Sequence, residues 1–90
     1  MQYKRTEKEI EYCAYLAEVI KELRNEKGVS LNKLALDSLM TPSTLCRIEN
    51  NLNTAQIVNL AKIAQGLEVP LSSVIKKLED KLPSNFFIDD

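Results

Sequence analysis

Two cysteines, Cys13 and Cys46, are the side chains of this 90-residue sequence best suited to nucleophilic or metal chemistry. They lie far apart in the chain and form no C-x-x-C pair, which argues against a zinc site and against a disulfide framework. The sequence contains no histidine, on which most general acid and base catalysis, catalytic triads and metal sites depend. These observations predict a protein that is not an enzyme and holds no metal or other cofactor, with both thiols reduced in the cytosol.

The charged side chains are nearly balanced over the whole chain but not along it. Lys and Arg number 12 against 13 Asp and Glu, a formal charge of −1, which removes the simplest argument for a nucleic-acid-binding protein. The middle of the sequence, from Lys21 to Lys62, has six cations and four anions, whereas both ends are acidic. Attraction to phosphates would rest on few groups, so we expect modest affinity for one protomer.

No stretch of the sequence is suited to a membrane or to export. No apolar run approaches the ~18 residues of a membrane span, and the charged first ten residues do not resemble a signal peptide. The composition, with 44% hydrophobic and 28% charged residues, is that of an ordinary globular domain. We therefore expect a single cytoplasmic domain with no membrane contact.

Apolar residues recur at three- and four-residue steps, the pattern of amphipathic helices. Gly28 is a typical helix end, and Thr41-Pro42 a typical helix start, because Thr caps free amides and Pro is tolerated at the first helical position. We expect Thr54 to cap the fourth helix, Gly66 to close it, and Pro83 to stop the fifth. The pattern predicts an all-α domain over residues 1–82 and a tail at 83–90, with helices at about 7–27, 31–38, 42–50, 55–66 and 71–81.

The connection between the second and third helices is very short, consisting of Leu39, Met40 and Thr41. A connection of this length holds two helix axes at a large angle, which is the geometry of a helix-turn-helix unit. Five helices joined by short loops make a compact all-α domain. We therefore expect the second and third helices to carry the function.

The segment LNKLALDSLMTPSTLCRIENN, followed by IVNLAKIAQGLEVPLSSV, contains many family-typical residues in order. Over roughly residues 20–78 the chain resembles the helix-turn-helix domain of the Cro/repressor (Xre-like) family, a compact five-helix domain of the phage-repressor type. So many matches in order are far more specific than any single motif. The positions that carry the resemblance are Leu23, Arg24, Gly28, Ser30, Leu34, Ala35, Thr41 to Leu45, Ile48, Glu49, Asn51, Leu60, Ile63 and Ala64.

The resemblance implies that helix 42–50 enters the major groove of double-stranded DNA and reads base edges. Its base-contacting positions fall on Pro42, Ser43, Thr44 and Arg47. Arg47 is the strongest candidate, because its planar guanidinium can donate twice to one guanine. From the residues alone, Ser43 and Thr44 are equally well explained as first-turn residues and Arg47 as a solvated helix cation.

The resemblance also implies which residues hold the domain together and place it on DNA. Arg24 and Glu49 correspond to an internal ion pair that ties the first helix to the end of the third. Phosphate contacts, which fix the register of the protein on the duplex, are implied for Ser30, Asn32, Lys33, Thr41, Asn51 and Asn53.

Three positions depart from the family pattern. Leu39 stands where the family usually has glycine, so we expect the turn either to take another conformation or to bury the leucine and so offset the strain. Leu31 replaces a Gln that commonly reaches a phosphate, so one polar contact should be missing. Asn51 replaces a Gly, which is a milder change because Asn adopts the left-handed conformation readily.

The predicted function is sequence-specific binding of double-stranded DNA by a small transcriptional regulator, more often a repressor in this family. Weak contacts per protomer favour a homodimer, with half-sites about 34–36 Å apart. Its surface would be helix 71–81 with the tail, or the long first helix. The alternative is a protein-interaction module, such as the antitoxin that binds a toxin partner.

Overall fold

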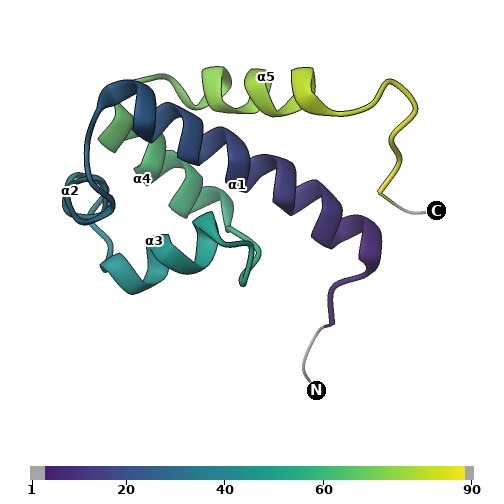
Figure 1. Ribbon diagram of the computed structural model, residues 1–90, viewed down its shortest axis with the longest axis horizontal. Coiled ribbons are helices and arrows are strands. Elements are labelled where there is room, and N and C mark those ends of the chain that lie inside the picture. Colours follow the sequence, from purple (N-terminus) through teal and green to yellow (C-terminus); the bar gives the residue numbers. More distant parts are fainter. Residues whose placement is uncertain (1–3, 89–90) are drawn as a thin grey trace.

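The computed structural model describes residues 4–88. This part of the chain contains five helices and no strand. Residues 1–3 of the predicted domain and 89–90 of the predicted tail lie outside the described residues. The predicted all-α class is therefore confirmed. Figure 1 shows α5 on one side of the long α1 and α3 on the other. The helices are α1 (Glu7–Lys27), α2 (Leu31–Asp37), α3 (Pro42–Glu49), α4 (Ile57–Leu67) and α5 (Leu71–Lys81).

Local hydrogen bonds set both ends of α1. Thr6 and Glu9 form a reciprocal capping box, in which the Glu9 N–H donates to Thr6 Oγ1 at 3.2 Å and the Thr6 N–H donates to Glu9 Oε1 at 2.7 Å. At the other end Gly28 takes the left-handed conformation with φ 75°, and its N–H donates to the Arg24 carbonyl at 3.0 Å. Helix α1 therefore begins and ends where the sequence indicates.

The turn between α2 and α3 is left-handed although its residue is a leucine. Leu39 has a φ of 57° and an exposed fraction of 77%. Both expectations for Leu39 are thus wrong, because the turn keeps the conformation that usually requires glycine and the side chain is not buried. Two backbone hydrogen bonds hold the turn instead, from the Leu39 N–H to Leu36 at 3.1 Å and from the Met40 N–H to Ala35 at 3.0 Å.

One apolar core joins all five helices. Each helix contributes one of the largest fully buried side chains, namely Ile20 from α1, Leu34 from α2, Leu45 from α3, Ile63 from α4 and Leu78 from α5. Because the short helices α2 and α3 are both anchored in this core, their positions relative to each other are fixed by packing as well as by the turn.

The expectation that Gly66 closes α4 is wrong. The helix continues to Leu67 and ends at Glu68, which takes the left-handed conformation with φ 62°. Gly66 is buried inside the helix, where a Cβ atom would overlap Ser38 Oγ and lie 3.1 Å from Leu34 Cδ1. The glycine therefore permits the close approach of α4 to α2 rather than ending a helix.

The C-terminal tail folds back onto α1. The Phe86 ring lies 6.1 Å from the Tyr12 ring and 6.3 Å from the Tyr15 ring, edge-on to the latter, and Lys8 Nζ lies 5.1 Å from its centroid. The next residue, Phe87, keeps an exposed fraction of 68%. Phe86 thus straps the tail to α1 and leaves Phe87 on the surface.

Candidate nucleic-acid interface

The exposed side of α3 carries three of the residues that the sequence predicts to contact bases. Pro42, Ser43 and Arg47 are exposed, whereas Leu45 and Ile48 are buried and attach the helix to the core. The helix therefore offers a short polar surface to solvent.

The fourth predicted base-contacting residue, Thr44, is half-buried and is tied to the start of α3. Its N–H donates to Thr41 Oγ1 at 3.2 Å, and the two hydroxyls share a hydrogen bond at 2.9 Å. Thr41 is the N-cap of the helix, as the sequence predicts, with Pro42 at the first helical position. This capping fixes the N-terminal end of α3, next to its exposed polar surface.

The Arg47 side chain makes no hydrogen bond and no ion pair with any residue between 4 and 88. Its guanidinium therefore keeps all five N–H donors for solvent or for a ligand. This distinguishes Arg47 from Arg24, whose guanidinium makes three hydrogen bonds inside the protein.

Arg24 and Glu49 form a bidentate ion pair that links α1 to the last residue of α3. Arg24 Nε lies 2.8 Å from Glu49 Oε2, Nη2 lies 3.1 Å from Oε1, and Nη1 donates to the Val29 carbonyl at 3.2 Å. The Glu49 side chain has an exposed fraction of 2% and that of Arg24 is 19%. The hydrogen bonds to Glu49 raise the pKa of Arg24 above its ordinary value, although burial opposes this shift. The pair that the family resemblance implies is thus present, and it fixes α3 against α1.

The predicted phosphate-contacting residues lie at the starts of two helices and in the turn after α3. Apart from Asn51, which is half-buried, all of them are exposed. The Ser30 hydroxyl caps α2 by accepting from the Lys33 N–H at 3.0 Å, and Lys33 Nζ lies 3.1 Å from Asp37 Oδ1. The set consists of Ser30, Asn32, Lys33, Thr41, Asn51 and Asn53.

Asn51 is held by a residue that sequence reasoning missed. Arg5 donates from Nη1 to Asn51 Oδ1 at 3.0 Å and from Nη2 to the Asn51 carbonyl at 2.9 Å. Asn51 Nδ2 donates to the Ile10 carbonyl at 2.9 Å, and its backbone is left-handed with φ 58°. No spacing pattern in the sequence predicts this contact, because three helices lie between Arg5 and Asn51 along the chain.

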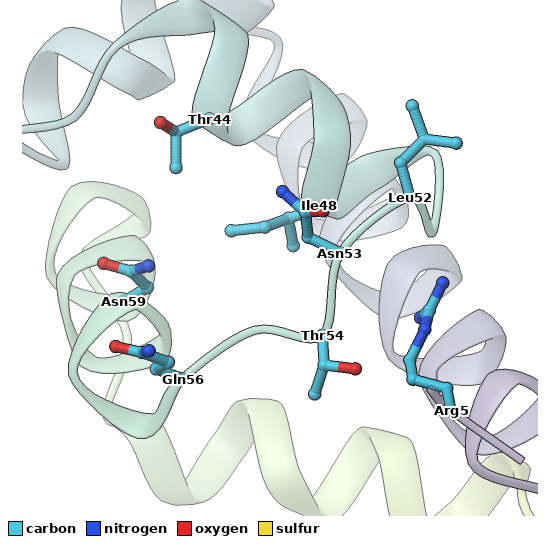
Figure 2. A pocket seen from close by; sticks show the side chains of 8 residues that line it. All are labelled: Arg5, Thr44, Ile48, Leu52, Asn53, Thr54, Gln56 and Asn59. Atoms are coloured by element: carbon cyan, nitrogen blue, oxygen red, sulfur yellow. The ribbon is translucent and has the colours of Figure 1, made fainter. Parts of the chain in front are cut away.

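A polar cavity of about 520 Å³ lies between α3, the turn after it and α4 (Figure 2). Arg5 and Thr54 lie on one side of it, and Gln56, just before α4, and Asn59 of α4 lie on the other. Sequence reasoning assigned no binding role to any of these four. The cavity is lined by Arg5, Thr44, Ile48, Leu52, Asn53, Thr54, Gln56 and Asn59.

Helix α4 begins later than the sequence indicates. Its N-cap is Gln56, not Thr54, and no side chain caps it. Thr54 lies outside the helix, with its Oγ1 3.9 Å from Cys13 Sγ. The first amides of α4 therefore have no side-chain acceptor, which makes them available to an external one.

The described part of the chain offers neither a cluster of metal ligands nor a membrane-spanning helix. No group of three His, Cys, Asp or Glu side chains there could hold a metal ion. No helix within residues 4–88 is long and apolar enough to cross a lipid bilayer. Cys13 is half-buried and Cys46 exposed, and both are free thiols.

A family model for helix-turn-helix domains matches residues 20–74, more than half of the chain. The chain belongs to the helix-turn-helix family. In this helix-turn-helix chain the matched segment begins within α1 and ends within α5, so it includes α2, α3 and the turn that follows. Arg5 and Ile10, which hold Asn51, lie before it.

Three known proteins similar to this helix-turn-helix chain are named as regulator or controller proteins. The HTH-type transcriptional regulator SutR of Escherichia coli (strain K12) is 36% identical over 70 residues, which cover 78% of this chain but only 39% of SutR. The wild-type restriction-modification controller protein C.Esp1396I superposes with a TM-score of 0.73 at 30% identity, over 77% of this chain and 91% of that one. The clp gene regulator ClgR from C. glutamicum superposes with a TM-score of 0.75 over 82% and 96%, but at 22% identity, which shows the fold alone.

Proposed function

We propose that this chain is a small transcriptional regulator, a repressor, that binds double-stranded DNA sequence-specifically with α3 in the major groove. The observation that carries the proposal is the exposed side of α3, where Pro42, Ser43 and Arg47 face solvent on a helix fixed by the Arg24–Glu49 pair. The major groove admits an α-helix and shows a distinct pattern of donors and acceptors for each base pair. The names of SutR, a transcriptional regulator, and C.Esp1396I, a controller protein, support a regulatory role.

The four residues of α3 make different contacts with base edges. Arg47, with its donors unused, pairs with O6 and N7 of a guanine, which contributes about 1–3 kcal/mol of discrimination. Ser43 donates to or accepts from a base, and Pro42, which has no N–H, contacts a thymine methyl group. Thr44, half-buried at the edge of the surface, contributes at the margin of the site.

Contacts to phosphates flank α3 on both sides. Ser30, Asn32 and Lys33 at the start of α2, Thr41, and Asn51 and Asn53 after α3 supply short polar or cationic groups, and the uncapped amides of α4 add free donors. Lys33 already pairs with Asp37, so its contribution is small. Few net charges carry the attraction, and binding is therefore modest for one protomer and strongly salt-dependent.

A homodimer provides the second half-site. The outward residues of α5 are mostly polar, and Lys76 there pairs with Asp80 at 3.4 Å. Apolar side chains are more exposed on the tail and at the start of α1, where Phe87 is 68%, Ile88 39% and Ile10 41% exposed. These exposures favour a dimer surface that includes the tail and the start of α1. A single species at monomer mass in sedimentation at high protein concentration would contradict it.

The test of the proposed function is the binding of the purified chain to duplex DNA over a range of salt concentrations. The proposal predicts retention on random duplex that weakens as salt rises, and tighter binding to one sequence than to the random pool. Indifference to DNA at low salt, together with tight association with a protein partner such as a toxin, would show a protein-interaction module instead.

A further inference from the structure

One charged side chain lies among the residues that line the cavity beside α3. It is Arg5, which precedes α1, and the other lining residues of the described chain are polar or apolar but uncharged. The helix-turn-helix segment begins at residue 20, so Arg5 belongs to a part of the chain outside that segment. The cavity therefore combines groups from α3, the turn and α4 with a cation from elsewhere in the sequence (Figure 2).

The Arg5 guanidinium is held in place before any ligand binds. Its two hydrogen bonds to Asn51, at 3.0 and 2.9 Å, fix the plane of the group. Asn51 is itself anchored to α1 through the bond from its Nδ2 to the Ile10 carbonyl. A cation that is already immobilised loses less conformational entropy when it binds an anion than a free surface side chain does.

The charge of Arg5 is not neutralised by these contacts. Both acceptors on Asn51, an amide oxygen and a backbone carbonyl, are uncharged, and Arg5 forms no ion pair with any residue in the range 4–88. Two of its five N–H groups are used by Asn51, which leaves the others for a further acceptor. A planar guanidinium of this kind suits a phosphate, whose oxygens accept charge-assisted hydrogen bonds.

We infer that Arg5 binds a backbone phosphate of the DNA that α3 reads, and that the segment before α1 is therefore part of the DNA-binding surface. This inference rests on the proposed function. Thr44 of α3 lines the same cavity, which places the Arg5 site beside the reading helix. Asn51 acts as the positioning residue that holds Arg5 there. Each such phosphate contact adds about 0.9 to the slope of log affinity against log salt concentration.

The test compares Arg5→Gln with Lys4→Gln in the full chain, on a duplex chosen by in-vitro selection. Lys4 is exposed, carries the same charge and does not line the cavity, so it is the matched control. We expect Arg5→Gln to lower the salt slope by about 0.9 per protomer. Raising the salt concentration from 50 to 200 mM should then weaken DNA binding by this variant about 3.5-fold less than it weakens binding by the wild type. Lys4→Gln should keep the wild-type slope.

Arg5→Lys is a second comparison, which remains valid even if Arg5→Gln does not fold correctly. It keeps the charge and should keep the salt slope, although it loses the two-pronged contact with Asn51. A wild-type slope for Arg5→Gln, or an equal decrease for Lys4→Gln, would overturn the inference while leaving the proposed function intact. A wild-type protein that binds no duplex at any salt concentration would overturn both.

Discussion

Replacing Arg24 by methionine should destabilise the fold strongly without touching the DNA-binding surface. Arg24→Met keeps a long apolar stem but removes the guanidinium that holds Glu49 at 2.8 and 3.1 Å. The Glu49 side chain has an exposed fraction of 2%, so water replaces the lost partner only poorly. The variant therefore leaves a buried charge without its counterion at the end of α3.

The magnitude follows from the burial of the two partners. Breaking a buried ion pair by removing one side costs about 3–5 kcal/mol. Because the Arg24 side chain is 19% exposed, some water already reaches the pair, and the lower figure of about 3 kcal/mol applies. In a domain of this size 1 kcal/mol shifts the melting temperature by about 4–8 °C, so Tm should fall by ~12–24 °C.

The assay is urea and thermal unfolding followed by circular dichroism. Arg47→Met is the matched control, because Arg47 is exposed and unpaired, and it should change the free energy of unfolding by less than about 0.5 kcal/mol. Changing Arg24 and Glu49 together to methionine should restore much of the loss, since an apolar pair can replace a buried ion pair. An Arg24→Met protein within about 1 kcal/mol of the wild type would show that the Arg24–Glu49 pair does not stabilise the fold.

Three further changes test other parts of the structure. Arg47→Ala should reduce the preference for the selected duplex over random duplex by about 5- to 150-fold, measured by competition, while thermal unfolding stays at the wild-type value. Gly66→Ala should cost about 1–3 kcal/mol in urea unfolding, because its Cβ overlaps Ser38 Oγ. Ser38→Ala in the same chain should recover part of that loss, since this buried hydroxyl has no partner in the described structure, and no recovery would count against the overlap. The hydrogen bond and charge of Lys27 lower the pKa of Glu68, so their stabilisation is present at neutral pH and is lost as pH falls below about 4.3. Lys27→Met should therefore lose less stability than the wild type between neutral and acid pH, and equal losses would show that the pair is not coupled to folding.

The helix positions could be predicted from the sequence because short-range chemistry sets most of them. Thr41-Pro42 and Gly28 act through their own backbone and their nearest neighbours, and the structure shows them capping α3 and α1. The exposed polar side of α3 follows from helical spacing in the same way. The link between Arg24 and Glu49 required the family resemblance, because the two residues are distant in the sequence.

The features that the sequence did not reveal depend on contacts between distant segments. Gly66 is a residue that often ends a helix, but its role is set by Ser38, the C-cap of α2. Leu39 keeps a left-handed backbone because two hydrogen bonds close the end of α2. The conformational preference of a single residue does not predict this stabilisation. Arg5 reaches Asn51 across the fold, and the cavity that Arg5 lines is formed by segments that are distant in the sequence.

Sequence reading by α3 is tested most directly by in-vitro selection of duplexes from a random library with the wild-type chain, with Arg47→Ala selected in parallel. The wild type should enrich one sequence containing a guanine, repeated in half-sites about 10–10.5 base pairs apart. Arg47→Ala should lose the preference at that guanine and keep binding to random DNA. A wild-type selection that enriches no sequence over the starting library would show that α3 does not read the major groove.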